Sequence, residues 1–329
     1  MKKLLTVSCV LALNVVMGCG GAPAVSDTPE DVPPASVAPA KAEAPAETPP
    51  APTVATPVVT YATGFSTPES VFYDAEEDVY LVSNIQGSPT AADKNGYISK
   101  LSPDGTVIAE KWIDGTQKGV TLSAPKGMGV VDGKLYVADI DFVRVFDRAT
   151  GKPVKSIKVF GAKFLNDIAV GADGSVYVSD SGLKITDKGF EPTGTDAVWK
   201  VSLKAAAERV TAKKADLGRP NGLLATAGGI WVSTFAAAEL FRLGDKGAKA
   251  DVVTLPAGGL DGIVAAADGT IYVTSWEAKA IYKGKAGAVF EPALPGVTLE
   301  SPADIGYDSK RNRLLVPLFM GNQVLAFQL

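Results

Sequence analysis

The feature that most constrains the fold is a segment that recurs six times between about residue 61 and the C-terminus. Each copy opens an apolar strand and continues, after a turn, into a second strand such as "DVYLVSN" (78–84), "GSVYVSD" (174–180) or "GTIYVTSW" (269–276). The copies recur about every 40 residues, stretched twice to about 55, which is typical of four-stranded propeller blades. Apolar residues alternate or run continuously, which excludes a helical solenoid of similar period. The sequence therefore predicts an all-β fold, a six-bladed β-propeller with four-stranded blades.

The two ends of the repeat region predict how the ring closes. The sixth copy supplies only three strands before the chain ends at Leu329, whereas the segment "VVTYAT" (58–63) is an extra strand ahead of the first copy. We expect this N-terminal strand to pair as the fourth strand of blade six, which makes the strand count complete. A loose N-terminal strand is the alternative. The propeller is thus expected to span residues 56–329.

The N-terminal segment predicts export and anchoring. Lys2 and Lys3 precede an apolar run that ends near Met17, which is typical of a secretory signal peptide over residues 1–18. "VMGC" (16–19) resembles a bacterial lipobox, and this resemblance implies cleavage before Cys19 and lipidation of that residue. The alternative is a plain signal peptide with an incidental cysteine. We expect a lipid-anchored protein of the cell envelope at the outer membrane, because Gly20 and not Asp follows the cysteine.

Residues 19–55 differ in composition from the rest of the chain. After the cysteine they consist mostly of Ala, Pro, Val, Ser, Thr and acidic residues. Such a segment does not bury enough apolar surface to fold, and its prolines favour an extended coil. We interpret it as a disordered tether that holds the propeller away from the membrane, with the lipid as the only membrane contact.

Two absences restrict the chemistry. The 329 residues contain no histidine, and the only cysteines, Cys9 and Cys19, lie in the predicted leader or at its cleavage site. This excludes the usual Ser-His-Asp and Cys-His nucleophile systems, and zinc or haem sites that need His or Cys. Any chemistry must use carboxylates, amides, Lys, Arg, Tyr or a hard metal bound through oxygen. The net charge of −4 gives no sign of a nucleic-acid surface, and we expect a monomer that acts on a small molecule.

The first residue of each inner strand predicts a polar ring. Inner strands of a propeller line its central channel, so these six side chains should converge on the axis. Four of them carry oxygen donors, and two carboxylates with two amides are a suitable ligand set for Ca²⁺ or another hard divalent cation. In blade order the six residues are Glu69, Lys126, Asn166, Asn221, Asp261 and Ala303.

These positions resemble a known family. Pro68-Glu69, Asn166-Asp167, Pro220-Asn221-Gly222 and Asp261-Gly262 match, blade for blade, the metal-binding motifs of the gluconolactonase/senescence-marker-protein/luciferin-regenerating family of six-bladed propellers. The resemblance covers residues 60–329. It implies a divalent cation, usually calcium, held by Glu69, Asn166, Asn221 and Asp261, and hydrolysis of a lactone or phosphotriester. It also implies that Asp261 acts as general base or nucleophile.

Structural roles for the same residues remain open. Asn and Asp are common before strands because their side chains cap backbone groups. Lys126 is out of place in a calcium site: its ammonium either pairs with the carboxylates and replaces the metal, or points along the channel and binds a substrate anion. We expect Asp167 to face away from Asn166 and to hold neighbouring backbone. Glycine at the same position in other blades suits close packing between blades.

The ends of the second strands predict a substrate pocket. They should lie on the same face as the ring, together with the two long insertions "IQGSPTAADKNG" (85–96) and "SGLKITDKGFEPTGTD" (181–196). Asn84, Lys126, Asp180 and Trp276 are therefore the candidate substrate-binding residues. Trp276 and Phe319 are expected either to line an apolar or sugar-stacking wall or to pack within the blades. Length drift in tolerant loops is the alternative for the insertions.

Two functions remain possible from the sequence. The first is a calcium-dependent hydrolase, such as a lactonase, in which Asp261 takes a proton or orients water and Lys126 or Asn84 stabilises the substrate oxygen. The second is a non-catalytic propeller that binds a partner at the cell envelope, with Lys126 neutralising the ring. The position of the Lys126 ammonium distinguishes them.

Overall fold

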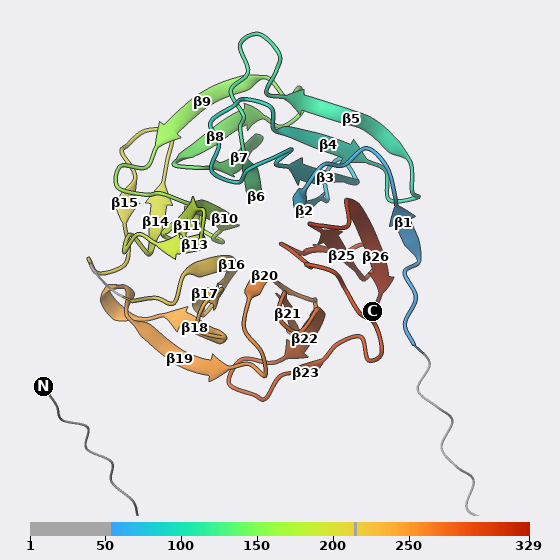
Figure 1. The fold of residues 1–329 in the computed structure, drawn as a ribbon, viewed down its shortest axis with the longest axis vertical. Coiled ribbons are helices and arrows are strands. Elements are labelled where there is room, and N and C mark those ends of the chain that lie inside the picture. The colour runs from blue at the N-terminus through green and yellow to red at the C-terminus, as the bar shows by residue number, and fades with distance from the viewer. Residues whose placement is uncertain (1–53, 214–215) are drawn as a thin grey trace, which may run out of the picture. The chain divides into compact units, whose positions relative to one another are not determined.

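The strands form six four-stranded antiparallel sheets arranged as the blades of a propeller (Figure 1). The computed structural model describes residues 54–213 and 216–329. The six four-stranded blades confirm the fold predicted from the repeat. The predicted signal peptide, Cys19 and the tether up to residue 53 lie outside the described residues.

The blades follow one another along the chain, each with its innermost strand first. Blade one holds β2 (Pro68–Asp74), β3 (Val79–Asn84), β4 (Tyr97–Leu101) and β5 (Val107–Asp114). Blade two holds β6 (Pro125–Val131), β7 (Lys134–Asp139), β8 (Phe142–Asp147) and β9 (Pro153–Lys158). Blade three holds β10 (Leu165–Val170), β11 (Val176–Asp180), β14 (Ala197–Val201) and β15 (Glu208–Arg209), with an extra hairpin of β12 (Leu183–Thr186) and β13 (Gly189–Pro192) between β11 and β14.

The second half of the ring repeats the same order. Blade four holds β16 (Pro220–Thr226), β17 (Gly229–Thr234), β18 (Glu239–Leu243) and β19 (Lys249–Thr254). Blade five holds β20 (Leu260–Ala265), β21 (Ile271–Ser275), β22 (Ala280–Gly284) and β23 (Glu291–Pro292). Blade six holds β24 (Gly306–Asp308), β25 (Arg313–Leu318), β26 (Gln323–Gln328) and, as its outermost strand, β1 (Val59–Tyr61).

The N-terminal strand closes the ring, as predicted. β1 pairs antiparallel with β26, with Val59 opposite Ala326 and Tyr61 opposite Val324. In Figure 1 the blue β1 lies beside the red β26. Tyr61 is buried against Tyr80 of blade one, with ring centroids 6.3 Å apart. The same strand therefore completes blade six and contributes to the core beside blade one.

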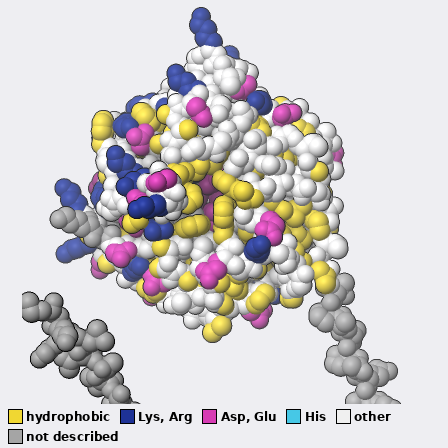
Figure 2. Space-filling model, viewed as in Figure 1, with side chains coloured by type: hydrophobic (Ala, Val, Ile, Leu, Met, Phe, Trp, Pro, Cys, Tyr) yellow, Lys and Arg dark blue, Asp and Glu magenta, His cyan; other side chains and the backbone are white. Residues whose placement is uncertain are grey.

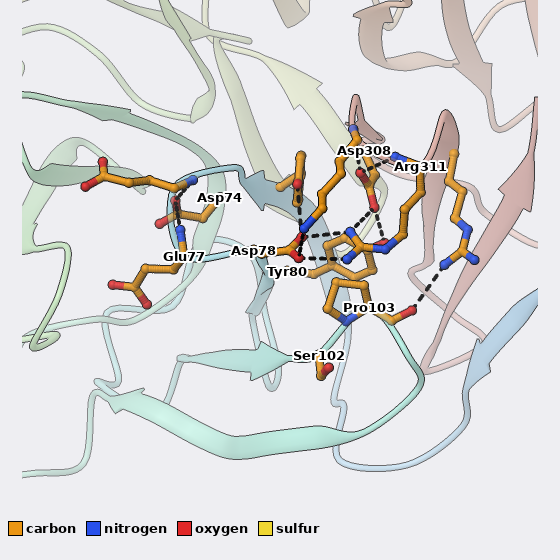
Figure 3. Close-up of polar contacts among 12 residues, drawn as sticks. Asp74, Glu77, Asp78, Tyr80, Ser102, Pro103, Asp308 and Arg311 are labelled. Carbon is orange, nitrogen blue, oxygen red and sulfur yellow. Dashed lines mark hydrogen bonds and ion pairs between the residues drawn. The ribbon is translucent and has the colours of Figure 1, made fainter.

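A polar network also joins blades six and one (Figure 3). Arg311, in the turn between β24 and β25, donates hydrogen bonds to Asp78 at 2.7 Å and to Asp308 at 2.9 Å. The Tyr80 hydroxyl of blade one donates a hydrogen bond to Asp308 of blade six at 2.6 Å. Tyr80 and Asp308 are both fully buried. Side-chain hydrogen bonds thus add to the strand pairing at the point where the ring closes.

The core lies between successive blades. Alternate residues of each strand face the neighbouring blade, so Val, Ile, Leu and aromatic side chains form a buried cluster at each interface. The helical content of the described residues is one 3₁₀ turn at Asp245–Gly247. Within the described part of the chain, no helix is long and apolar enough to span a membrane.

Candidate functional site

A cavity opens on the face of the ring where the inner strands begin. Figure 2 shows a central hollow on this face, surrounded by hydrophobic side chains, with acidic side chains inside it. The cavity has a volume of about 50 Å³. Five of the six predicted ring residues line it, namely Glu69, Lys126, Asn166, Asn221 and Asp261. The structure therefore brings together side chains from five separate blades.

A β-bulge at the start of the inner strand in blades one to five positions the ring residues. In blade three Leu165 pairs with Asp180 and Ile168 pairs with Val178, so two residues of β10 face one of β11. The same shift occurs at the start of β2, β6, β16 and β20. Bulges redirect side chains and are frequent beside functional sites. Because of the bulge, Asn166 does not take part in the regular strand pairing, although β10 pairs regularly with β11 from Ile168 onward.

Hydroxyl groups on the second strands of blades three, four and five link each of these blades to the next. The Ser179 hydroxyl accepts the Asp167 N–H at 2.9 Å and donates to the Asn221 carbonyl at 2.6 Å. Ser233 donates to the Asp261 carbonyl at 2.5 Å. Thr274 accepts the Gly262 N–H at 2.9 Å and donates to the Ala303 carbonyl at the same distance. The backbone of Asn221, Asp261 and Ala303 is thus fixed by the preceding blade.

The two carboxylates of the ring are buried and incompletely hydrogen-bonded. Glu69 and Asp261 are 5% and 4% exposed, and Glu69 Oε2 and Asp261 Oδ1 have no hydrogen-bond partner. Burial, followed by the charge of Asp261, raises the pKa of Glu69 well above its usual value. Burial, followed by the charge of Asp304, does the same to the pKa of Asp261. Two buried carboxyl groups with free oxygens must be neutralised, either by a proton or by a bound cation.

Two further ring contacts orient the donors. The Trp276 indole N–H donates to Asp261 Oδ2 at 2.8 Å, which leaves only Oδ1 of that carboxylate without a partner. The Asn166 side-chain NH₂ donates to the Ser181 hydroxyl at 3.1 Å, so the amide oxygen is not used by this bond. Both contacts leave oxygen atoms available to a ligand in the cavity.

Lys126 does not neutralise the carboxylates by direct contact. Its ammonium donates to the carbonyls of Pro89 at 3.2 Å and Ala124 at 3.0 Å, and it lies 4.6 Å from the centre of the Phe164 ring. Among the described residues, no carboxylate lies within ion-pair distance of this ammonium. Burial lowers the pKa of Lys126, and the charge of Glu69 partly offsets this. The ammonium thus faces the cavity wall and leaves the centre of the ring open.

The donor set of the ring fits a hard divalent cation. Within residues 54–213 and 216–329, no group of three or more His, Cys, Asp and Glu side chains has metal-binding geometry. The polar ring has four oxygen-bearing side chains, of which two are carboxylates and two are the amides of Asn166 and Asn221. Carboxylate and amide oxygens are the ligands that Ca²⁺ prefers, and two carboxylate oxygens here have no protein partner. The chemistry and the unpaired oxygens both suit calcium.

Asn84 and Asp180, expected to contact a substrate, lie instead beneath the loops. Asn84 accepts the Ser66 N–H at 3.1 Å and donates to Ser99 at 3.1 Å. Asp180 accepts the Phe164 N–H at 2.8 Å and the Gly182 N–H at 3.0 Å. Both side chains are fully buried and neither lines the cavity. Their position at the end of a second strand makes them caps for the segment that leads into the inner strand.

Several cavity residues were missed from the sequence. Both predicted insertions reach the cavity, where Pro89, Leu183 and Phe190 line it. The residue directly after each second strand lines it in five blades: Ile85, Ser181, Phe235, Trp276 and Phe319. Trp276 and Phe319 were expected at this wall from the sequence, and both line the cavity. In blades one and three the residues chosen from the sequence were Asn84 and Asp180, one position too early, and neighbouring residues of a strand end face opposite sides.

A second hollow opens at the opposite end of the channel. It has a volume of about 420 Å³ and is lined in part by Ser70, Asp167 and Asp304. Asp167 accepts the Leu223 N–H at 2.6 Å and its neighbour Ile168's N–H at 2.6 Å, as predicted for a residue that holds backbone. Asp304 accepts the Ser70 hydroxyl at 2.5 Å. Because protein groups already bind these carboxylates, the smaller cavity at the ring is the better candidate site.

Solved structures with similar folds include enzymes of two kinds. A gluconolactonase from Xanthomonas campestris superposes with a TM-score of 0.61 at 18% identity, over 82% of this chain and 87% of that one. A second structure, whose name proposes a gluconolactonase, gives 0.63 at 16% identity over 85% and 93%. A virginiamycin B lyase from Staphylococcus aureus, in complex with quinupristin, gives 0.55 at 14% identity over 80% of each chain.

The chain shares the six-bladed propeller of these enzymes. At such identities the likeness establishes the fold. It agrees with the gluconolactonase-type propeller inferred from the sequence motifs. No protein-family model matches the sequence, and no curated protein matches it at the significance required.

Proposed function

We propose that this protein is a calcium-dependent hydrolase that cleaves a lactone or a related ester, anchored to the cell envelope through Cys19. The observation that carries the proposal is the pair of buried, unpaired oxygens, Glu69 Oε2 and Asp261 Oδ1, at the bottom of an open cavity. Leaving such atoms without a partner is costly, so their retention points to a bound cation.

The cation would be held by Glu69, Asn166, Asn221 and Asp261. When bound, it supplies Lewis-acid catalysis, which polarises the substrate carbonyl and acidifies water. Asp261 accepts the proton from the attacking water, while the Trp276 indole N–H holds its second oxygen. The Lys126 ammonium has three N–H donors, of which Pro89 and Ala124 take two. The third is available to the oxygen of the substrate carbonyl.

The neighbours favour the hydrolase over the lyase. A variant of the staphylococcal lyase in which a histidine is replaced by alanine is described as catalytically inactive. This chain has no histidine, so a reaction that depends on that side chain is not transferable. Carboxylate chemistry, in contrast, needs only residues that the ring contains.

The test uses the chain from Gly20 to Leu329, which keeps the tether and the complete propeller. Lactone hydrolysis is measured with calcium, with a chelator, and in the variants Glu69→Gln and Asp261→Asn. Activity should require calcium and fall at least about 100-fold in Asp261→Asn, in the range for loss of an acid–base group. Asp268→Asn, in an exposed turn of blade five, is the matched control. Activity that survives both the chelator and Asp261→Asn contradicts the proposal.

A non-catalytic binding module is the second candidate. The extra hairpin β12–β13 exposes Ile185 and Phe190, which are 39% and 45% accessible, and apolar side chains at the surface of a rigid disc suit a partner. Thermal unfolding separates the candidates, because a tightly bound native cation raises the melting temperature. Absence of a calcium shift together with absence of hydrolysis favours the binding module.

A further inference from the structure

We propose that the substrate is an ester or lactone with a bulky apolar group, such as an alkyl or aryl chain, and not a sugar lactone. The inference rests on the proposed hydrolase function and adds the substrate class. The substrate class is inferred from the side chains that form the cavity walls, whereas the reaction is inferred from the carboxylates at the bottom of the cavity.

The cavity walls offer almost no hydrogen-bonding groups. Outside the ring of Glu69, Lys126, Asn166, Asn221 and Asp261, Ser181 is the single polar side chain that lines it. Its hydroxyl is already engaged, since it donates to the Pro220 carbonyl at 2.8 Å and accepts from Asn166. A sugar lactone carries several hydroxyls, and each one buried without a partner weakens binding about tenfold or more.

Aromatic side chains from four consecutive blades build the walls. Phe235, Trp276 and Phe319 follow the second strands of blades four, five and six. The Trp276 ring lies against both phenylalanines, with its centroid 6.0 Å from that of Phe235 and 5.1 Å from that of Phe319. Blade three adds Phe164 and Phe190, whose centroids are 6.1 Å apart. Edge-to-face contacts of this kind hold the rings in place and leave apolar surface toward the cavity.

Trp276 connects the apolar wall to the reactive end. Its indole N–H is bonded to Asp261, while its ring is in contact with Phe319. When the apolar group of a substrate lies against this wall, the adjoining ester bond therefore lies close to the oxygen-bearing side chains of the polar ring. Phe190 lies in the β12–β13 hairpin and is 45% exposed, so it is available to a ligand at the mouth of the cavity.

The test compares γ-lactones that carry alkyl chains of increasing length with gluconolactone, using the Gly20–Leu329 chain with calcium. Full burial of a methylene contributes ~0.8 kcal/mol. Because the cavity has a volume of only about 50 Å³, the alkyl chain extends toward its mouth, and kcat/KM should rise by at most about fourfold per methylene over the first members of the series. Gluconolactone should be a poor substrate. Phe319→Ser should flatten the dependence on chain length. The matched control, Phe160→Ser, replaces a phenylalanine that is 77% exposed and does not line the cavity.

A second readout measures binding without hydrolysis. γ-Lactams with the same alkyl chains resist cleavage, and their binding is followed by the fluorescence of Trp276, with Trp276→Phe as the reference for the other tryptophans. Affinity should rise with chain length in the same way. Lactam binding without any lactone cleavage supports the apolar site and overturns the hydrolase. Preference for gluconolactone with no dependence on chain length overturns the apolar site and keeps the hydrolase. Neither cleavage nor binding overturns both.

Discussion

Replacement of Asp304 by Asn should stabilise the metal-free protein, and more so at alkaline than at acidic pH. Burial raises the pKa of Asp304 from its ordinary value of 3.8 to about 7, even though the Ser70 hydroxyl donates to it. The folded state therefore keeps the proton at pH values where the unfolded chain has lost it. The contribution of this carboxyl to stability is full below pH 4 and is lost as the pH rises through 7.

The magnitude follows from the shift. A rise of about three pKa units corresponds to about 4 kcal/mol of unfavourable free energy near pH 8, and to about 2 kcal/mol near pH 5. The amide of Asn carries no charge, so Asp304→Asn removes this penalty at both pH values. Any cost of the altered contact with Ser70 applies equally at both. Relative to the natural protein, the variant should thus gain about 2 kcal/mol more near pH 8 than near pH 5.

Urea unfolding in the presence of a chelator measures this difference. The chelator is needed because a cation at Glu69 and Asp261 would change the electrostatics of the channel. A change in the free energy of unfolding that is the same at both pH values would refute the argument, because it would show that Asp304 of the folded protein is ionised in both conditions.

Three further predictions address closure, blade packing and the site. Tyr80→Phe removes the buried hydrogen bond to Asp308; it should lower the free energy of unfolding by about 2 kcal/mol and leave hydrolysis unchanged, and a loss of hydrolysis would contradict this. Gly222→Ala places a methyl group 2.4 Å from the Asp261 carbonyl oxygen and should cost about 2 kcal/mol or more in chemical unfolding, whereas Gly228→Ala, with its nearest neighbour at 3.7 Å, should be neutral; equal effects would refute the packing argument. Trp276→Phe removes the donor to Asp261 Oδ2 and should weaken calcium binding about tenfold in a competition titration, with Trp112→Phe as the control; unchanged affinity would mean that the indole does not orient the carboxylate.

The repeat made the fold predictable, because it specifies both the blade count and the strand that closes the ring. The ring residues were predictable for the same reason: equivalent positions of a repeat become neighbours around one axis. The close blade packing expected at glycine positions is also observed, since a Cβ on Gly127 would lie 2.2 Å from Asp167.

The walls of the cavity were harder to predict. Asn84 and Asp180 have side chains typical of ligand binding, yet each caps a loop. A polar residue at a strand end can hydrogen-bond to a substrate or to the backbone. Which of the two it binds depends on the direction of its side chain, which the sequence does not show. The bulges have the same effect, because one additional residue reverses the faces of all that follow. The role of the Ser179 hydroxyl depends on a neighbouring blade and has no local sequence signal.

The pairing of β1 with β26 determines when, during synthesis of the chain, the ring can close. Val59–Tyr61 are among the first residues of the propeller to be synthesised, and their partners Val324–Ala326 are among the last. The ring is therefore completed only after β26 has been synthesised, and a chain that stops before β26 leaves β1 without a partner and the circle open. Such long-range pairing is slow to form, so the chain passes through an open form before it becomes a rigid disc.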